Sequence, residues 1–468
     1  MTMTTIQGFE GELVHPSLDI KNGVLVLGFR YRFNQKEEKK IFFIAHDGTV
    51  RISEDDSFEA NSIRYFVDAK KRMLARLEDR WGLTDAKTFL DAQTNTIASC
   101  YPKPNELFAE IINLLKRFIE LEEETDYALV AAWITGTYFF PLFSAYPFLH
   151  IKAPKRSGKS QLLGLLRQLC FNAVKARPSL AALSDTVDSL RGTYLIDQAD
   201  SIGRKGNEDL LDILADSYKK GGGKRRVVEF SKDKARSVTE FETYAPKAFA
   251  SIKELPEDLR DRCLIVSLMR SAKNFPDANE GDELWKRMRG KLYRHLIDSF
   301  TNLESFYILK KAESKTNEAM IGRHLELWLP LEAILTNCGM SNEKIIAARQ
   351  RFLSWYGFAE YEPSEIEEAV VLALMKQFEN GASDAVFSPQ DIAELIPDDL
   401  FPASKTPAQR ASSVGWVVKK FNLATDKLSR SGKGNRYRFE KAKVEKVWGR
   451  YFASSPTSPT QALPSLDG

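Results

Sequence analysis

The chain has 468 residues, of which 43% are hydrophobic and 28% are charged. This composition is typical of a globular protein and excludes disordered and fibrous classes, and the length predicts two to four domains. The formal net charge of +3 is nearly neutral for this size, so only local clusters of charge can indicate a nucleic-acid partner.

The four cysteines are scattered and show neither a paired spacing for zinc nor a disulfide framework. They are Cys100, Cys170, Cys263 and Cys338. A reduced cytoplasmic compartment fits this usage best, and the N-terminus carries no basic-then-apolar signal pattern. We therefore expect a cytoplasmic protein.

Residues 1–95 are expected to form a separate α+β module. Apolar and polar residues alternate as in strands over 24–32, 40–45 and 49–52. The stretch 60–81 has the pattern of an amphipathic helix with a basic face. Such a face is more often solvated than a DNA site.

Residues 104–345 alternate helical patterns with short apolar strands, which predicts an α/β domain. The run 128–151 has no charged side chain and is long enough to span a bilayer. It contains Gly136, Pro141 and Pro147 and leads directly into a phosphate-loop motif. We therefore predict a buried helix, a turn and a buried strand, and no membrane span.

A phosphate-binding loop is indicated by a strand at 148–151, the segment APKRSGKS and a helix at 161–169. Backbone N–H groups and the helix N-terminus would face the phosphates of ATP. Lys159 is expected to reach the β- and γ-phosphates, and the Ser160 hydroxyl to hold Mg²⁺. Alanine replaces the usual first glycine. The candidate ATP-binding residues here are Ala153, Pro154, Lys155, Arg156, Ser157, Gly158, Lys159, Ser160 and Gln161.

The segment TYLIDQAD, about 38 residues after Lys159, is a buried strand that ends in an acid. This Walker B pattern predicts that Asp197 holds Mg²⁺ through its water shell. Gln198 stands where the pattern calls for a glutamate. Its amide can position water but cannot accept the proton of that water as a carboxylate does. Two interpretations stay open: a slow switch in which Asp200 is the base, or a glutamine introduced to trap the ATP-bound state.

The segment PKAFASIKELPEDLRDRCLIV, with strands at 246–252 and 263–268, resembles the sensor 1 and arginine-finger segment of AAA+ ATPases. With HIKAPKRSGKS, TYLIDQAD and GRHLELWLPLEAI, it is similar to helicase-like ATPases of phages and mobile elements. Among these are the MCM-like, self-loading replicative helicases of staphylococcal cassette elements. The resemblance covers about residues 105–451.

The resemblance implies a role for several further residues. Ser251 would occupy the sensor 1 position and orient the attacking water. Arg262 would be the arginine finger that reaches the site of a neighbouring subunit, with Arg260 as the alternative. Arg323 would be a sensor 2 that touches the γ-phosphate. The expected catalytic set is Lys159, Asp197, Gln198, Ser251 and Arg262, and the expected assembly is a ring, a hexamer.

A basic, glycine-rich interval at 218–226 precedes two strand-like segments, 227–230 and 238–244. In MCM-like and superfamily III helicases this interval holds a hairpin that projects into the ring pore. Three glycines among cations would make a mobile loop that grips DNA phosphates, although a solvated flexible loop is the alternative. The candidate DNA contacts are Lys219, Lys220, Lys224, Arg225, Arg226, Lys232 and Lys234.

Residues 363–451 are expected to form a winged-helix domain. Helices are predicted at 363–377, 389–395 and 409–421, the third being the recognition helix, and a wing at 429–439. Local basicity of this kind is the footprint of phosphate binding, although a winged helix can instead mediate protein contacts. The candidate DNA contacts are Arg410, Lys419, Lys420, Arg430, Lys433, Arg436 and Arg438.

The sequence thus predicts an α/β AAA+ P-loop core that uses ATP and Mg²⁺, flanked by an N-terminal module and a winged helix. The tail 453–468 is rich in Ser, Pro and Thr and is expected to be disordered. The expected function is a ring-forming helicase or translocase on single-stranded or forked DNA. One alternative is a replication initiator or defence ATPase that switches without unwinding; another is a DNA-binding regulator with a degenerate ATPase.

Overall fold

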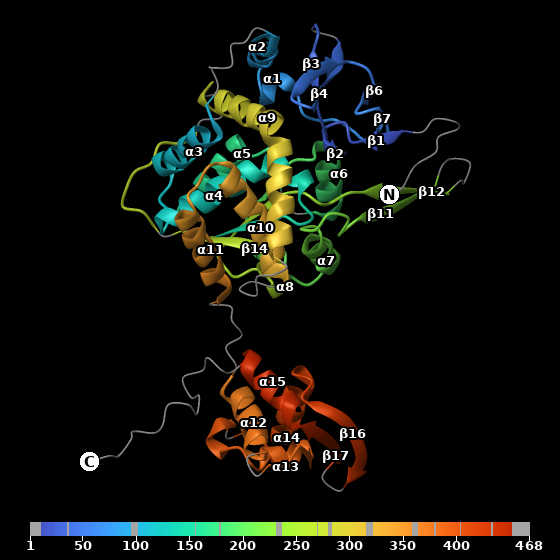
Figure 1. Cartoon of the computed structure of the whole chain (residues 1–468). Coiled ribbons are helices and arrows are strands. Elements are labelled where there is room, and N and C mark those ends of the chain that lie inside the picture. The colour runs from blue at the N-terminus through green and yellow to red at the C-terminus, as the bar shows by residue number, and fades with distance from the viewer. Residues whose placement is uncertain are drawn as a thin grey trace. The chain divides into compact units, whose positions relative to one another are not determined.

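The computed structural model divides the chain into two compact units, Met1–Tyr356 and Gly357–Gly468 (Figure 1). Each unit is described by itself. The structure describes residues 11–34, 37–94, 102–154, 156–176, 179–230, 236–268, 270–278, 283–314, 322–357, 364–378, 381–402, 404–431 and 434–451.

The first unit begins with two small sheets. One is the antiparallel sheet β2-β3-β4-β5, and the other has the order β1-β7-β6. The strands predicted at 24–32, 40–45 and 49–52 are confirmed as β3, β4 and β5. The strands are β1 (Glu12–Val14), β2 (Leu18–Lys21), β3 (Val24–Arg32), β4 (Glu38–His46), β5 (Thr49–Ser53), β6 (Ser57–Ala60) and β7 (Ile63–Val67).

The helix predicted over 60–81 is wrong. Asn61 and Ser62 have φ values of 52° and 59°, which suits the two-residue turn of a hairpin, and this turn joins β6 to β7. Tyr65 and Val67 are buried on one face of β7, so the true period of this stretch is two. Only the short α1 (Leu77–Arg80) is helical here, and α2 (Leu83–Thr94) follows it.

A five-stranded parallel sheet forms the centre of the first unit, in the order β14-β8-β13-β10-β9. The strands are β8 (Phe148–Lys152), β9 (Val174–Ala176), β10 (Tyr194–Ile196), β13 (Lys247–Ser251) and β14 (Cys263–Ser267). Four of them were predicted from apolar segments, and the fifth, β9, is a three-residue strand with Lys175 at its centre. Parallel strands place their carboxyl ends at one edge of the sheet, where α/β proteins bind ligands.

Helices surround this sheet, and the hairpin β11–β12 projects from the body (Figure 1). The helices are α3 (Pro104–Phe118), α4 (Glu124–Phe139), α5 (Lys159–Leu169), α6 (Leu180–Leu190), α7 (Glu208–Asp216), α8 (Glu257–Arg260), α9 (Glu283–Glu313), α10 (Gly322–Asn337) and α11 (Asn342–Gly357), with short 3₁₀ turns η1 (Phe140–Leu142) and η2 (Ala199–Ser201). The hairpin strands are β11 (Arg225–Phe230) and β12 (Arg236–Phe241).

The uncharged run 128–151 is the buried helix, turn and strand that the sequence predicts. Helix α4 is buried on all sides from Asp126 to Phe139, and η1 connects it to β8. A helix that is apolar all round belongs inside a large core. Among the described residues, no helix is both long enough and apolar enough to cross a membrane.

One face of the β2-β3-β4-β5 sheet shares a core with the parallel-sheet region, and its other face forms a smaller core with β1, β6 and β7. Residues 11–94 therefore belong to the same compact unit as the parallel sheet. The ring centroids of Phe29 and Tyr293 lie 5.4 Å apart, and those of Phe43 and Trp81 lie 5.0 Å apart. The centroids of Trp81 and Tyr293 lie 5.4 Å apart. Aromatic pairs at these distances each add about 0.5–1.5 kcal/mol beyond simple burial. The docking of residues 11–94 is therefore part of the fold of this unit.

The second unit has its own core and a three-stranded antiparallel sheet in the order β15-β17-β16. The three helices and the hairpin predicted for 363–451 are present. The elements are α12 (Glu365–Lys376), β15 (Asp384–Phe387), α13 (Pro389–Ala393), η4 (Asp398–Leu400), α14 (Pro407–Lys420), β16 (Ala424–Ser431), β17 (Gly434–Glu440) and α15 (Lys441–Tyr451). The tail 453–468 lies outside the described residues.

Candidate nucleotide site

The loop between β8 and α5 has the backbone of a tight, strained turn. Gly158 has a φ of 91°, and a Cβ at this position would lie 2.9 Å from the Ile119 side chain. Arg156 has a φ of 63°, which is unusual for a residue with a side chain. Such strain clusters at ligand-binding sites. Lys155 lies outside the described residues.

Lys159 begins α5 and folds its ammonium back over the loop. Its Nζ donates hydrogen bonds to the carbonyl oxygens of Ala153 at 2.5 Å and Pro154 at 2.8 Å. The Ser157 hydroxyl also donates to the Pro154 carbonyl, at 2.7 Å. These acceptors are neutral, so an anion placed at the loop would compete favourably for the ammonium.

Two further residues of the predicted ATP site begin α5. The Ser160 side chain is exposed, so its hydroxyl is accessible for a metal or a phosphate. Gln161 instead turns to the backbone, and its Nε2 donates to the carbonyl oxygen of Pro276 at 2.6 Å. Gln161 therefore joins the helix to the segment that follows β14.

The carboxyl edge of the sheet brings the predicted residues together. β13 lies between β8 and β10, and Ser251 at its end is in register with Lys152 at the end of β8. Ile196 at the end of β10 is in register with Phe249, so Asp197 follows at the same edge. The phosphate loop, Ser251 and Asp197 thus lie at the ends of three neighbouring strands, as in a P-loop ATPase core.

Asp197 is half-buried and forms an ion pair with a lysine. Its Oδ2 lies 2.8 Å from the Nζ of Lys175, a residue of the edge strand β9. Its Oδ1 accepts the backbone N–H of Gln198 at 3.0 Å. Gln198 has a φ of 56° and an exposed side chain. The sequence analysis did not predict Lys175 as a partner of Asp197. The one feature that marks Lys175 in the sequence is its charge within a very short strand.

Asp200 holds the loop that follows β13. Its carboxylate accepts the backbone N–H groups of Ile252 at 3.1 Å and Lys253 at 2.8 Å. Two N–H donors fix the position of this carboxylate. This arrangement gives Asp200 a structural role, and it does not support Asp200 as the base that replaces a glutamate at position 198.

Ser251 is fully buried, and its hydroxyl bonds within the chain. The hydroxyl donates to the carbonyl oxygen of Lys253 at 2.6 Å and lies 2.7 Å from the Nε2 of His150. Burial lowers the pKa of His150 to about 4, so the ring is neutral at pH 7. We assign the proton to Nε2, which then donates to Ser251. The serine therefore fixes the loop at the sheet edge.

Arg262 lies at the opposite, amino edge of the sheet. Its carbonyl oxygen accepts the N–H of Phe148, the first residue of β8, at 2.9 Å. A five-residue strand spans about 16 Å, so Arg262 is far from the phosphate loop of its own subunit. It is 8% exposed; its guanidinium donates to the Asp258 carbonyl and lies 5.3 Å from the ring centroid of Tyr218.

Two other arginines near α8 are more accessible. The Arg260 side chain is 30% exposed, and its Nε lies 3.8 Å from the carboxylate of Glu254. The Arg323 side chain is 38% exposed, and its Nη1 lies 3.4 Å from the Oδ2 of Asp261. Arg323 at the start of α10 therefore lies beside Asp261, in the segment that was predicted to carry an arginine finger.

The cations predicted to grip DNA in the glycine-rich interval have partners in the same unit. Lys219 pairs with Glu326 at 2.8 Å. Lys220 donates to the Pro141 carbonyl oxygen at 2.9 Å, and burial lowers its pKa. Arg225, at the start of β11, is half-buried. The charge of this loop is thus partly neutralised inside the chain.

The base of the β11–β12 hairpin is held by ion pairs across its strands. The Glu240 carboxylate lies 2.5 Å from the Nζ of Lys224 and 2.9 Å from the Nε of Arg226. Lys232 and Lys234, predicted at the hairpin tip, lie outside the described residues. The contact of this hairpin with DNA stays a prediction.

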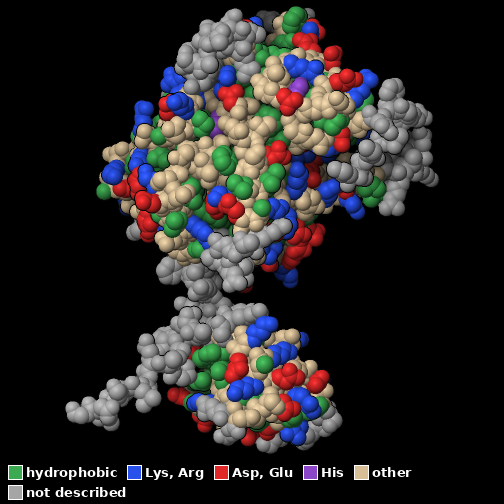
Figure 2. Space-filling view, viewed as in Figure 1, with side chains coloured by type: hydrophobic (Ala, Val, Ile, Leu, Met, Phe, Trp, Pro, Cys, Tyr) green, Lys and Arg blue, Asp and Glu red, His purple; other side chains and the backbone are tan. Residues whose placement is uncertain are grey.

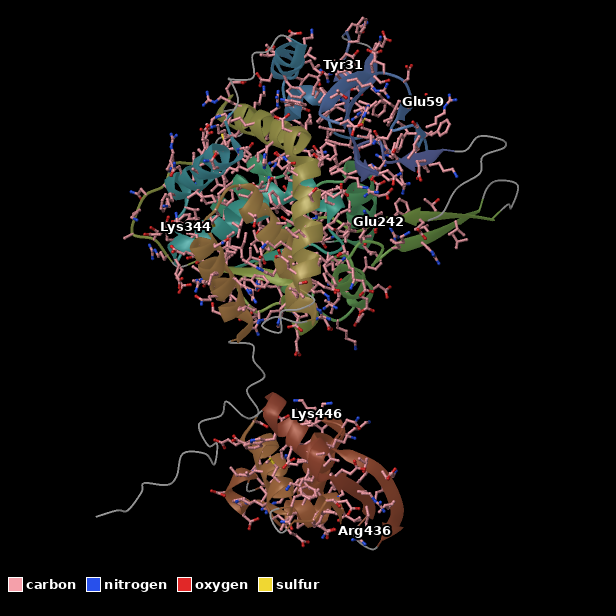
Figure 3. The ribbon with its side chains drawn as sticks, in the orientation of Figure 1. Tyr31, Glu59, Glu242, Lys344, Arg436 and Lys446 are labelled. Atoms are coloured by element: carbon pink, nitrogen blue, oxygen red, sulfur yellow. The ribbon has the colours of Figure 1, made fainter. Side chains whose placement is uncertain are left out.

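In the second unit, three predicted cations pair with carboxylates of that unit: Arg410 with Asp398, Lys420 with Glu367, and Arg438 with Asp384. Lys419 is exposed on α14, and Arg436 on β17 (labelled in Figure 3) donates to the Val386 carbonyl. The side chains of Arg430 and Lys433 lie outside the described residues. Figure 2 shows basic and acidic side chains interspersed on the visible face of this unit.

No protein-family model matches the chain, and no curated protein matches it. Solved structures align with it at low similarity. The NrS-1 C-terminal region in its A-form apo structure has 10% identity and a TM-score of 0.36, over 89% of this chain and 96% of that one. A full-length MCM homolog from Methanopyrus kandleri has 11% identity and a TM-score of 0.33, over 71% and 77%. The JCV helicase has 15% identity and a TM-score of 0.21, over 62% and 77%.

Proposed function

We propose that this protein is a DNA helicase or translocase driven by ATP hydrolysis and assembled as a ring, a hexamer. The observation that carries the proposal is the meeting of the phosphate loop, Ser251 and Asp197 at one edge of a parallel sheet. This arrangement supplies a cation for phosphates, a carboxylate for a metal and a fixed loop between them. Phosphoryl transfer needs little more than such positioning and charge neutralisation.

The residues present fit ATP and Mg²⁺. Lys159 would exchange its two carbonyl acceptors for the β- and γ-phosphates of ATP. Ser160 and Asp197 offer hydroxyl and carboxylate oxygens, the ligand type that Mg²⁺ prefers. Asp197 already attracts the ammonium of Lys175, so a cation is stable beside it. The metal, when bound, would neutralise charge on the transferring phosphoryl group.

An arginine finger, on this proposal, acts on the site of a neighbouring subunit. Arg262 and the phosphate loop lie at opposite edges of the sheet, so Arg262 could serve only the loop of a neighbouring subunit. Because Arg262 is buried, the exposure of the side chains favours Arg260 as the finger, with Arg323 beside it. Arg262 would then hold Tyr218 and the amino edge in place.

Two elements support DNA as the substrate. The second unit has the order helix, strand, helix, helix and hairpin, which supports a winged helix with α14 as its recognition helix. On α14, Trp416 is 57% exposed and Lys419 is exposed, so the helix presents a stacking surface and a cation. The β11–β12 hairpin projects from the first unit (Figure 1) and is the candidate pore element.

Strand displacement tests this proposal against the alternative of a switch that binds DNA without unwinding. A forked duplex with one labelled strand is incubated with the protein, ATP and Mg²⁺, and the displaced strand is quantified. We expect displacement that depends on ATP and is lost in Lys159→Ala. ATP turnover that rises with DNA but gives no displacement would favour the initiator or defence switch. No turnover in either condition would favour a regulator with a degenerate ATPase.

A further inference from the structure

A cavity of about 470 Å³ lies in the first unit, between the segment that follows β7 and the parallel-sheet core. Its walls come from residues 74–80, the end of α5 at 167–168, the start of β9 at 173–175, and α9. Pockets for small ligands typically measure about 300–1,000 Å³. The cavity is therefore of a size suited to a small molecule.

The lining of this cavity is strongly basic. The cations in it are Arg76, Arg80, Arg167, Lys175, Lys286 and Arg289, and the acid is Asp79. Three of these cations pair with carboxylates outside the lining: Arg76 with Glu38, Lys175 with Asp197, and Lys286 with Glu283. Within the lining itself, cations outnumber acids six to one.

Arg289 is the most deeply placed cation, at 6% exposure. Its guanidinium donates to the carbonyl oxygens of Arg80 at 2.8 Å, Gln168 at 3.0 Å and Asp79 at 3.1 Å. These acceptors are neutral, and burial lowers the pKa of Arg289. A charge buried without a counter-charge is costly. An anion in the cavity would offset that cost.

Arg80, a neighbour of Arg289 in the lining, also bonds to a neutral group. The guanidinium of Arg80 donates to the carbonyl oxygen of Ala173 at 3.4 Å through both Nη atoms, so a neutral group accepts these bonds too. The Nε of Arg76 is buried and has no hydrogen-bond partner among the described residues. Buried donors are normally satisfied, but Arg76 pairs with Glu38 through Nη2, so only Arg80 and Arg289 add to the case for an anion.

We propose that this cavity binds a small anion that carries two or more phosphate groups, of the nucleoside polyphosphate class. Arginine forks match the paired oxygens of phosphate groups and bind them at two points. Converging cations around one bounded cavity fit a small ligand better than a strand, and the lining has no aromatic side chain on which bases would stack.

Binding of inorganic tripolyphosphate by calorimetry tests this site without any need for ATP hydrolysis. The full-length chain carrying Lys159→Ala is used, so that the phosphate loop lacks its main phosphate ligand. We expect saturable binding of one equivalent at the cavity. Adding Arg167→Gln or Lys286→Gln should weaken it about tenfold each, the usual worth of a charge-assisted hydrogen bond.

Lys344→Gln is the matched control, because Lys344 is exposed on α11 (labelled in Figure 3), does not line the cavity and carries the same charge. It should leave binding unchanged. Circular dichroism confirms that each variant is folded, and Arg80→Gln provides a third test at the cavity. Equal binding in the control and in all three cavity variants, or no binding at millimolar tripolyphosphate, would overturn the proposal.

A second arm replaces tripolyphosphate by a short single-stranded oligonucleotide without a terminal phosphate. We expect its affinity to change little in Arg167→Gln and Lys286→Gln. If these variants lose oligonucleotide binding and keep tripolyphosphate binding, the cavity belongs to a nucleic-acid surface and the small-ligand proposal is wrong. Because both readouts are equilibrium binding, neither result depends on whether the protein is a helicase.

Discussion

The two edges of the parallel sheet hold their polar groups in different ways. At the carboxyl edge, Lys159 bonds only to backbone carbonyls and Asp197 to one partly exposed lysine. At the amino edge, Arg262 lies under Tyr218, and Lys247 is fully buried against the Phe148 ring. Lys159, Arg262 and Lys247 all donate to backbone carbonyls, so the two edges differ in burial. Lys159 and Asp197 are partly exposed and can exchange their partners for a ligand, whereas Arg262 and Lys247 are enclosed by packing and cannot. On the proposed function, the groups that bind and react with ATP lie at the carboxyl edge, and the polar groups of the amino edge contribute to stability.

The largest effect on ATP turnover should come from Lys159→Ala, at the carboxyl edge. ATP turnover should fall to background, because the β/γ-phosphate charge loses its cation. Turnover is measured by phosphate release with and without single-stranded DNA, and Lys344→Ala serves as the control. Wild-type turnover in Lys159→Ala would refute the assignment of the phosphate loop.

The neighbouring arginines Arg260 and Arg262 should separate into a catalytic and a structural residue. Arg260→Ala should lower turnover by about 10³-fold or more, as the loss of a finger does in related chemistry, with little change in melting temperature. Arg262→Ala should instead lower the melting temperature by several degrees, because it empties a packed position.

Mixing subunits shows whether Arg260 acts between neighbours. Rings that combine Arg260→Ala with Lys159→Ala contain some interfaces with an intact loop and an intact finger, so part of the activity should return. Mixed rings are verified by native mass spectrometry. Rescue with Arg262→Ala and not with Arg260→Ala would reverse the two roles.

Gln198→Glu should raise turnover by about 10²-fold, the usual worth of a general base, because it places a carboxylate at the carboxyl edge. Initial rates of phosphate release at saturating ATP measure this. Asp200→Asn should weaken the contacts to Ile252 and Lys253 and lower stability. If Gln198→Glu has no effect while Asp200→Asn abolishes turnover, Asp200 is the base and its structural role is secondary.

The smallest effect concerns Lys247 at the amino edge, whose pKa burial lowers to about 7. In the unfolded chain this lysine titrates near its ordinary value, so between pH 7 and about 10 the unfolded state binds more protons. Wild-type stability should therefore gain a contribution from Lys247 as pH rises through this window. Lys247→Met should lack that gain and be more stable at neutral pH. Chemical unfolding at pH 7 and pH 9 tests this, and an identical pH dependence in both proteins would contradict it.

The local order of elements around the site could be predicted from the sequence. A strand, a glycine-containing loop and a helix are consecutive in the chain, and short-range sterics and hydrophobic period determine them, so β8, the phosphate loop and α5 were found. The same holds for β10 with Asp197 and for the β11–β12 hairpin. The helix predicted at 60–81 was wrong because the spacing of its basic residues resembles one face of a helix. The Asn61-Ser62 turn instead begins a strand, in which buried residues alternate with a period of two.

Contacts between distant segments were decided only by the tertiary structure. Lys175 and Asp197 meet because β9 and β10 are neighbours in the sheet, and Asp200 meets Ile252 because β10 and β13 are. The basic cavity is likewise assembled from four separate stretches of chain. Conversely, the run 218–226 contains no acidic residue, and the carboxylates that pair with its cations, Glu326 and Glu240, come from other parts of the chain. The sequence thus determined which groups are present and the local elements that carry them. Which charges are neutralised depends on packing between segments far apart in the chain, and that was set by the tertiary fold.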